Sequence, residues 1–220
     1  HRAFRYTTVL KWDAAWQKAE FDLKNAVAAW FVVEPFKEFS PAAHTMVTFG
    51  FEDGRHLVIS AEVRKERGED YGVLRGLYRN FEIVYVAGDE RDLVELRAVH
   101  RKDDVYLYRI KAEAKQVQAY LKSMLDRMND LARQPEFYNT LSNNCTTSLA
   151  DHLEAVGGDD VPRWDYRLLL PGFSGELARD LGLLDTDLDW EATQKAALIN
   201  ERALKWATKP DFSRRIRGTP

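Results

Sequence analysis

The segment 44–64, "HTMVTFGFEDGRHLVISAEVR", constrains the fold of this chain most strongly. Two runs of alternating apolar and polar residues flank "EDG", which is the pattern of a β-hairpin. A three-residue loop with Gly54 in the left-handed region makes Val47 face Ile59 on one apolar face of the hairpin. A two-residue turn at 53–54 would mix apolar and polar side chains, so we expect the three-residue loop.

This register makes His44 and Glu62 cross-strand neighbours on the less apolar face. A carboxylate there can accept a hydrogen bond from one imidazole nitrogen and leave the other nitrogen to serve a nucleophile. The simpler interpretation is a structural pair on a half-exposed strand. The residues alone leave both interpretations open.

The remaining segments predict further strands and a series of helices. Strands are expected at 4–10, 26–36, 81–88, 93–100 and 104–110, and 12–25 is polar with a possible helical pattern. The period becomes helical from Glu113 until Pro135, and a second helix is expected from Cys145 to Gly157. Two more amphipathic helices are expected between 168 and 207, followed by the basic tail "KPDFSRRIRG".

These patterns predict one α+β domain over residues 1–220. The sheet is expected at about 1–112, a helical part with the cysteine at about 113–170, and a helical C-terminal extension at about 171–220. The chain starts with His1 rather than Met, so we expect a trimmed or processed product.

Composition excludes several classes of protein. The net charge is -3 and the 30% charged residues are interspersed, so nothing indicates binding to nucleic acid. A single cysteine excludes an internal disulfide and a multi-cysteine metal site. We expect neither a cofactor nor a metal, and no apolar run reaches the roughly 20 residues that span a bilayer.

The single cysteine lies in "SNNCTTSLADHLEAVGG", where the polar residues before it are candidate helix caps. Cys145 then falls in the first helical turn, where unpaired N–H groups and the positive end of the helix dipole favour a thiolate. Cys145, Leu149 and Leu153 share one helix face, which we expect to pack against the sheet. An inward thiol fits a nucleophile, and it also fits a buried small hydrophobe.

The position of each histidine in the sequence narrows the choice of a general base. His152 is about 10 Å along the same helix at 1.5 Å per residue, too far for a hydrogen bond, and we expect it at the surface or rim. His100 lies in a charged segment where we expect a solvated histidine, His1 is terminal, and His56 is near the turn and suited to solvent. His44 is therefore the candidate base.

The chain resembles the bacterial family defined by the N-terminal periplasmic domain of the lipoprotein N-acyltransferase Lnb. The motifs that carry the resemblance are "AHTMVTFGFEDGRHLVISAEVRKERGEDY", "GLYRNFEIVYVAGDERDLVELRAVHRKDDVYLYRI", "PEFYNTLSNNCTTSL", "LPGF" with "LGLLDTDL", and "DFSRRIR". The resemblance implies a circularly permuted papain-like (NlpC-type) fold. In this fold an antiparallel sheet packs against a helix that carries the cysteine at its N-terminus, and the histidine strand comes earlier in the chain.

The resemblance implies a role for several residues. Cys145 matches the nucleophile and His44 the general base, while Glu62 is our candidate for the orienting group from the hairpin register. Substrate-binding, oxyanion or positioning roles are expected for Asn144, Asn143, Tyr138, Arg64 and Tyr71.

The implied function is thiol-dependent acyl transfer through a cysteine acyl-enzyme. The expected reaction is N-acylation of a lipoprotein with a phospholipid as acyl donor, in the periplasm or cell envelope. Contact with the membrane surface would come through a segment outside this chain. A periplasmic cysteine amidase or peptidase acting on cell-wall peptides is an alternative, and a non-catalytic binding module that retains the fold is another.

Overall fold

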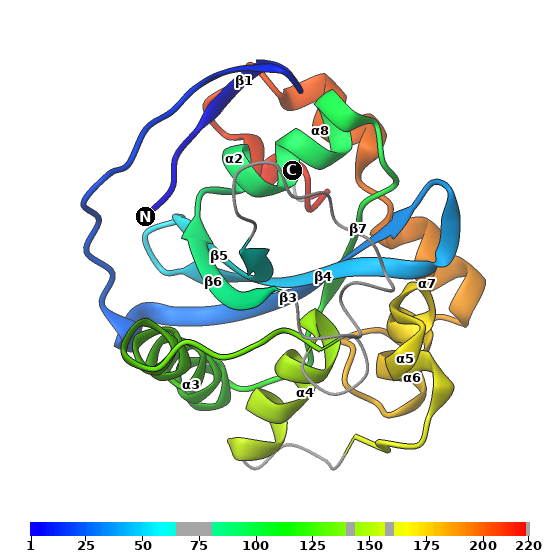
Figure 1. The fold of residues 1–220 in the computed structure, drawn as a ribbon. Helices are drawn as coiled ribbons and strands as arrows, with labels where there is room; N and C mark the ends of the chain where they lie inside the picture. The colour runs from blue at the N-terminus through cyan, green and yellow to red at the C-terminus, as the bar shows by residue number, and fades with distance from the viewer. Residues whose placement is uncertain (65–80, 140–143, 157–160, 219–220) are drawn as a thin grey trace.

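A five-stranded antiparallel sheet with the order β6-β5-β4-β3-β7 forms the centre of the protein (Figure 1). The computed structural model describes residues 1–64, 81–139, 144–156 and 161–218. The strands are β3 (Ala26–Phe36), β4 (Phe39–Phe51), β5 (His56–Arg64), β6 (Glu82–Gly88) and β7 (Tyr106–Arg109). The chain is therefore α+β, as expected from the sequence.

The β4–β5 hairpin has the predicted register. Val47 pairs with Ile59, and the paired positions run from Gly50 with His56 back to Met46 with Ser60. Residues 52–54 form a three-residue loop in which Gly54 has φ +80, a conformation that favours glycine. The ladder between the two strands is recorded no further than Met46 and Ser60, so the ends that carry His44 and Glu62 extend beyond it.

Helices cover both faces of the sheet, which lies between them in Figure 1. One face holds α3 (Ala114–Arg133) and α4 (Cys145–Ala155), and Phe49 and Ile59 pack there with Leu121 and Leu149. The other face buries Met46 and Val58 against Leu93, Ile199 and Phe212. Its covering elements are α2 (Glu90–Glu95), the π-helical turn η2 (Leu96–Arg101), α8 (Asn200–Trp206) and α9 (Phe212–Arg215).

The predicted boundaries of α3 and the predicted start of α4 are confirmed because both helices carry local signals, whereas the end predicted at Gly157 lies outside the described residues. Glu113 and Gln116 form a capping box at the start of α3, and the helix ends at Arg133, just before Pro135. Asn144 caps α4. Capping residues and proline act on residues close to them in the sequence, so the sequence alone predicts where they start or end a helix.

The predicted strand at 93–100 is wrong, because this segment forms parts of α2 and η2. Asp89 takes the N-cap position, and Glu90 and Asp92 place negative charge in the first turn. Leucine, glutamate, arginine and alanine dominate the segment, and these are good helix formers. The segment is buried on several sides, so its apolar residues follow one another closely, and such a run resembles a buried strand.

The helical expectation for 12–25 is also wrong. This segment contains β2 (Lys11–Asp13), which pairs with β1 (Arg5–Thr8), and the short 3-10 turn η1 (Leu23–Asn25). Between them the backbone binds the N-terminal segment, with Ala3 N 2.9 Å from Ala15 O. Backbone groups paired in this way cannot make helical hydrogen bonds.

The C-terminal part is more broken than the two helices expected. It contains α5 (Tyr166–Leu169), the 3-10 turn η3 (Pro171–Phe173), α6 (Ser174–Asp180), α7 (Trp190–Ala197), α8 and α9. The expected basic tail packs into the structure, because Phe212 and Ile216 are fully buried. Within the described ranges, no helix is both long and apolar enough to cross a bilayer.

Candidate active site

Cys145 is the first residue of α4, and the preceding residue fixes the helix start. The side-chain oxygen of Asn144 accepts from Thr147 N at 2.9 Å, and the Thr147 hydroxyl accepts from Asn144 N at 2.9 Å. This reciprocal cap fixes the first turn, with the positive end of the helix dipole near the thiol. The cysteine and Leu149 are buried on the same face, as predicted.

The sulfur lies beside Ala43, in the first half of β4. Sγ is 4.0 Å from Ala43 O and 3.9 Å from the Thr146 hydroxyl. The Thr146 hydroxyl is in turn 3.1 Å from that of Thr45. These contacts place the thiol beside the part of β4 that carries His44.

His44 contacts Glu62, as the hairpin register predicts. Nε2 is 2.7 Å from the Ser60 hydroxyl and 3.3 Å from Glu62 Oε1. Ser60 donates its own proton to Glu62 at 2.8 Å, so its oxygen accepts from His44 Nε2–H. Both polar contacts use Nε2, and Nδ1 is therefore the nitrogen that remains for the thiol.

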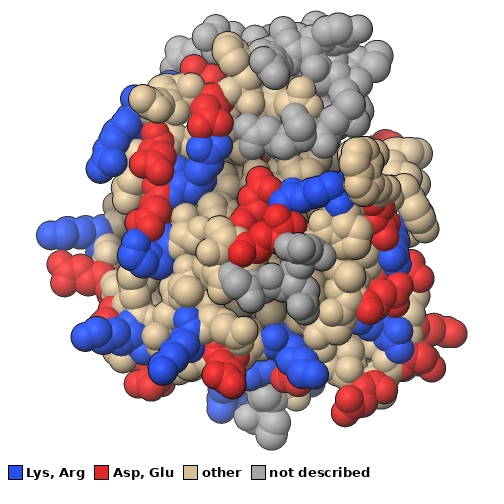
Figure 2. Space-filling model, turned by 90° about the horizontal axis from the view of Figure 1, so that it is seen from below, with Lys and Arg blue, Asp and Glu red and all other residues tan. Residues whose placement is uncertain are grey.

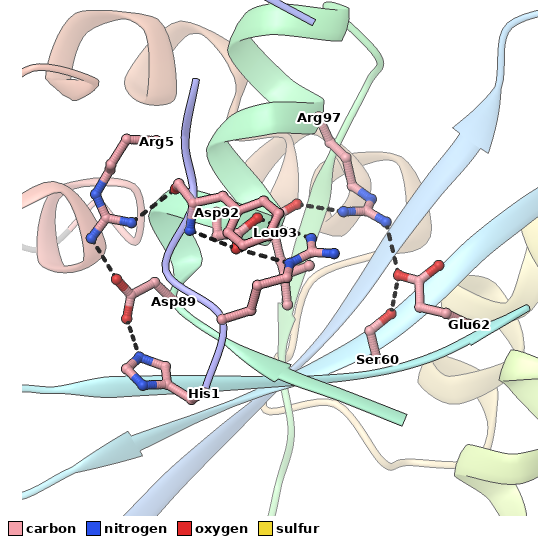
Figure 3. A network of polar contacts seen from close by, with 10 residues as sticks. His1, Arg5, Ser60, Glu62, Asp89, Asp92, Leu93 and Arg97 are labelled. Atoms are coloured by element: carbon pink, nitrogen blue, oxygen red, sulfur yellow. Dashed lines mark hydrogen bonds and ion pairs between the residues drawn. The ribbon is translucent and has the colours of Figure 1, made fainter. Parts of the chain in front are cut away.

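Arg97 supports this arrangement from the other side of Glu62 (Figure 3). It reaches down from η2, donates to Glu62 Oε1 at 3.2 Å and to Leu93 O at 2.8 Å, and binds Glu34 Oε2 at 2.5 Å. Burial raises the pKa of the Glu62 carboxyl, but His44 and Arg97 outweigh it and hold that pKa well below its usual range. Glu62 is therefore a fixed negative charge behind the imidazole.

The ionisation of the thiol is coupled to that of His44. Burial opposes ionisation of Cys145, but hydrogen bonding and charge from His44 outweigh burial, and the pKa of the thiol falls to about 7. Burial also lowers the pKa of His44, yet the Glu62 charge and the hydrogen bond to Cys145 raise it to about 10. The pair therefore favours thiolate and imidazolium near neutral pH.

A cavity of about 370 Å³ opens beside the thiol, and we call it the cleft. Its lining includes the ionisable residues His44, Glu62, Arg97 and Arg101. It also includes five apolar residues that we call the apolar wall, namely Phe36, Phe39, Leu169, Leu170 and Pro171. Phe39 is 56% exposed and Leu169 is 44% exposed, so this wall continues onto the surface.

Of the other predicted site residues, two line the cleft, one does not, and two lie outside the described residues. Tyr138 and Asn144 line the cleft, and the Asn144 side chain also caps α4. Arg64 does not line the cleft, because it pairs with Glu82 at 3.0 Å at the exposed end of β5. Asn143 and Tyr71 lie outside the described residues.

Ser60, Arg97 and Glu34 were missed by sequence reasoning. Ser60 had a signal, because it precedes Glu62 by two positions and shares its strand face. Arg97 had none, since its segment was assigned to a strand and its partner Glu34 is 63 positions away.

The other described histidines have structural partners away from the thiol. The expectation that His152 lies at the surface is wrong, because it is buried between Tyr85 at 2.9 Å and Ser123 at 2.8 Å. Burial and the charge of Arg127 lower its pKa to about 4.

His56 and His100 are less solvated than expected, and the terminal His1 also has a partner. His56 packs on Trp30 with ring centroids 5.7 Å apart. His100 Nε2 is 3.6 Å from Glu95, and His1 Nε2 is 2.8 Å from Asp89, as Figure 3 shows for the latter pair.

The described residues offer no group of three or more His, Cys, Asp and Glu arranged to hold a metal ion. On the face seen in Figure 2, positive and negative side chains are interspersed rather than gathered by sign.

Comparison with known protein families identifies one family whose model covers the candidate site. A family model described as the Lnb N-terminal periplasmic domain matches residues 12–172 of the 220. The chain belongs to this family. The match to the Lnb N-terminal periplasmic domain includes His44, Glu62 and Cys145, and it indicates a periplasmic location. No curated protein and no solved structure matches the chain.

Proposed function

We propose that this chain is a cysteine-dependent acyltransferase that N-acylates lipoproteins with a phospholipid as acyl donor. The observation that carries the proposal is the Cys145 thiol, whose pKa falls to about 7 at a helix start beside His44. Nucleophilic cysteines need such an environment, whereas a cysteine that only fills a core does not. Membership in the Lnb N-terminal periplasmic domain family supports the substrate class.

The first half of the proposed reaction forms an acyl-enzyme. The Cys145 thiolate attacks the ester carbonyl of the donor, and the new C–S bond leaves a negative charge on the carbonyl oxygen. Backbone N–H groups at the start of α4 stabilise this oxyanion. The C–O bond then breaks, His44 gives its proton to the departing alcohol, and a thioester remains on Cys145.

The second half transfers the acyl group to an amine. The uncharged α-amine of the acceptor attacks the thioester, a C–N bond forms and the C–S bond breaks. His44 takes the proton that the amine loses, which restores the thiolate and imidazolium pair. Glu62 and Ser60 hold the imidazole in place through both halves, and Tyr138 is assigned to positioning.

The composition of the cleft favours a lipid over a cell-wall peptide. A peptide site would present charged side chains that are available to bind amines and carboxylates. Here Glu62 is paired with Arg97, Arg101 lies 3.7 Å from Glu34, and the exposed wall is formed by Phe39 and Leu169. These apolar groups suit a donor presented at a membrane surface. This observation favours acyl transfer over the amidase.

We further propose that the fold is a permuted papain-like one. The order of histidine strand before cysteine helix supports this, as does α4 packing with its first residue against the first half of β4.

Intact-mass measurement after incubation with phospholipid vesicles tests the proposed function. We expect a mass gain equal to one fatty acyl group, which Cys145→Ser removes and a peptide with a diacylglyceryl cysteine at its N-terminus discharges. Reaction with peptide electrophiles, without acylation by any lipid, would favour the amidase instead. Absence of both reactions in folded protein would favour a non-catalytic module.

A further inference from the structure

A second, smaller cavity lies beside α4. Its volume is about 80 Å³, and its lining comes mainly from α4, α5, α6 and β3. Its main lining residues are Phe31, Leu149, Leu153, Leu168, Leu177 and Leu181. We call this space the inner cavity, to separate it from the cleft on the outer side of Cys145.

The polar side chains that reach the inner cavity already have partners in the protein. The hydroxyl of Thr146 is 3.1 Å from that of Thr45, and Ser174 donates to Pro171 O at 2.6 Å. Tyr120 donates to Leu149 O at 3.2 Å. A polar ligand would therefore lose its hydrogen bonds to water without replacing them, and a hydrocarbon would lose none.

The inner cavity begins next to the sulfur. Thr146 lines it, and the Thr146 hydroxyl is 3.9 Å from Cys145 Sγ. Leu149 and Leu153 follow on the cysteine face of α4, about 6 and 12 Å along the axis at 1.5 Å per residue. The cavity thus extends away from the thiol in the direction that a chain attached to sulfur can follow.

One short segment separates the inner cavity from the cleft. Leu168 and Ser174 line the inner cavity, whereas the residues between them, from Leu169 to Pro171, line the cleft. The two spaces therefore lie on the two sides of this segment.

We propose that the inner cavity binds the hydrocarbon chain of the acyl group carried on Cys145. This inference rests on the proposed function, and it adds where the chain lies and what sets its length. The lining of the inner cavity is almost entirely apolar, and a cavity of this kind favours an apolar guest over a polar one. Its size accommodates a short part of a chain, so small changes in volume alter the preferred length.

The test compares chain-length preference in variants of the full chain. Rates of Cys145 acylation are measured by intact mass with p-nitrophenyl acetate, butyrate and octanoate, which share one leaving group. Ala150→Leu fills the inner cavity, and Leu181→Ala enlarges it. Ala155→Leu, on the exposed side of the same helix, is the matched control, and circular dichroism checks the fold of each variant.

Filling the inner cavity is expected to lower the octanoate-to-acetate rate ratio about tenfold, since a few methylene groups in an apolar pocket change rates by this order. Enlarging it is expected to raise the ratio, and Ala155→Leu to leave the ratio unchanged. An unchanged ratio in both cavity variants would overturn the inference while leaving acyl transfer intact. A ratio shifted only by Ala42→Leu would place the chain in the cleft and overturn it too. Failure of all three esters to acylate native protein would instead refute the proposed function.

Discussion

Two groups of side chains lie beside the β4–β5 hairpin, and each combines histidine, glutamate and arginine. Their surroundings differ. We call His44, Ser60, Glu62 and Arg97 the His44 cluster, and Thr48, His56, Glu90 and Arg217 the Arg217 cluster. In the His44 cluster the imidazole adjoins a thiol and a cleft. In the Arg217 cluster the imidazole packs on Trp30, and the chain has no second cysteine.

The charges differ accordingly. Burial lowers the pKa of His56, and the charge of Glu90 does not offset it. Glu90 itself is buried, which raises its pKa, but Arg217 outweighs burial and lowers the pKa to about 2. Its partners are Thr48, whose hydroxyl donates at 2.6 Å, and Arg217, whose guanidinium lies 4.0 Å from the Trp30 centroid. Residue types alone therefore do not identify a site, because what the histidine faces decides its chemistry.

The largest expected difference between the clusters is in catalysis. His44→Ala should lower the rate of Cys145 acylation by about a hundredfold or more, as the loss of a general base does. His56→Ala should leave the rate close to that of native protein, because His56 lies at the other end of the hairpin. Intact-mass time courses with an activated ester measure both. Equal losses in the two variants would remove the distinction between the clusters.

Stability tests the structural role of the Arg217 cluster by itself. Arg217→Met leaves Glu90 buried without its ion partner, so we expect the free energy of unfolding to fall by about 3 kcal/mol. Lys209→Met removes the same charge from an exposed site and should change it by less than about 0.5 kcal/mol. Urea denaturation measures both variants. Comparable stabilities would mean that the C-terminal segment is not anchored by Glu90.

A smaller effect is expected when the carboxylate of each cluster is neutralised. Glu62→Gln removes the charge that keeps His44 protonated, so the pKa of His44 falls and that of the Cys145 thiol rises. Alkylation of Cys145 at pH 7 should then slow severalfold, because less thiolate is present. Glu90→Gln should leave alkylation unchanged. If Glu62→Gln has no effect on alkylation, Glu62 does not act on the thiol through His44.

The features that the sequence alone predicts depend on short-range patterns. The register that brings His44 to Glu62 follows from alternation and from Gly54, and the start of α4 follows from the polar residues before Cys145. The parts that were missed depend on distant partners. Arg97 binds Glu34 from a segment with an ambiguous apolar run, and Arg217 binds Glu90 from 127 positions away. His152 was misplaced for the same reason, since Tyr85 and Ser123 come from other elements.

The pH dependence of Cys145 alkylation in folded native protein shows whether His44 activates the thiol. The thiol is neutral below its pKa and reactive above it, so the rate constant should rise with a midpoint of about 7. Above pH 7 the thiolate pairs with imidazolium until His44 loses its proton at about 10. The rate of acylation by an ester should therefore stay constant between these two pH values. A midpoint near 8.5, the value of an ordinary thiol, would contradict activation of Cys145 by His44.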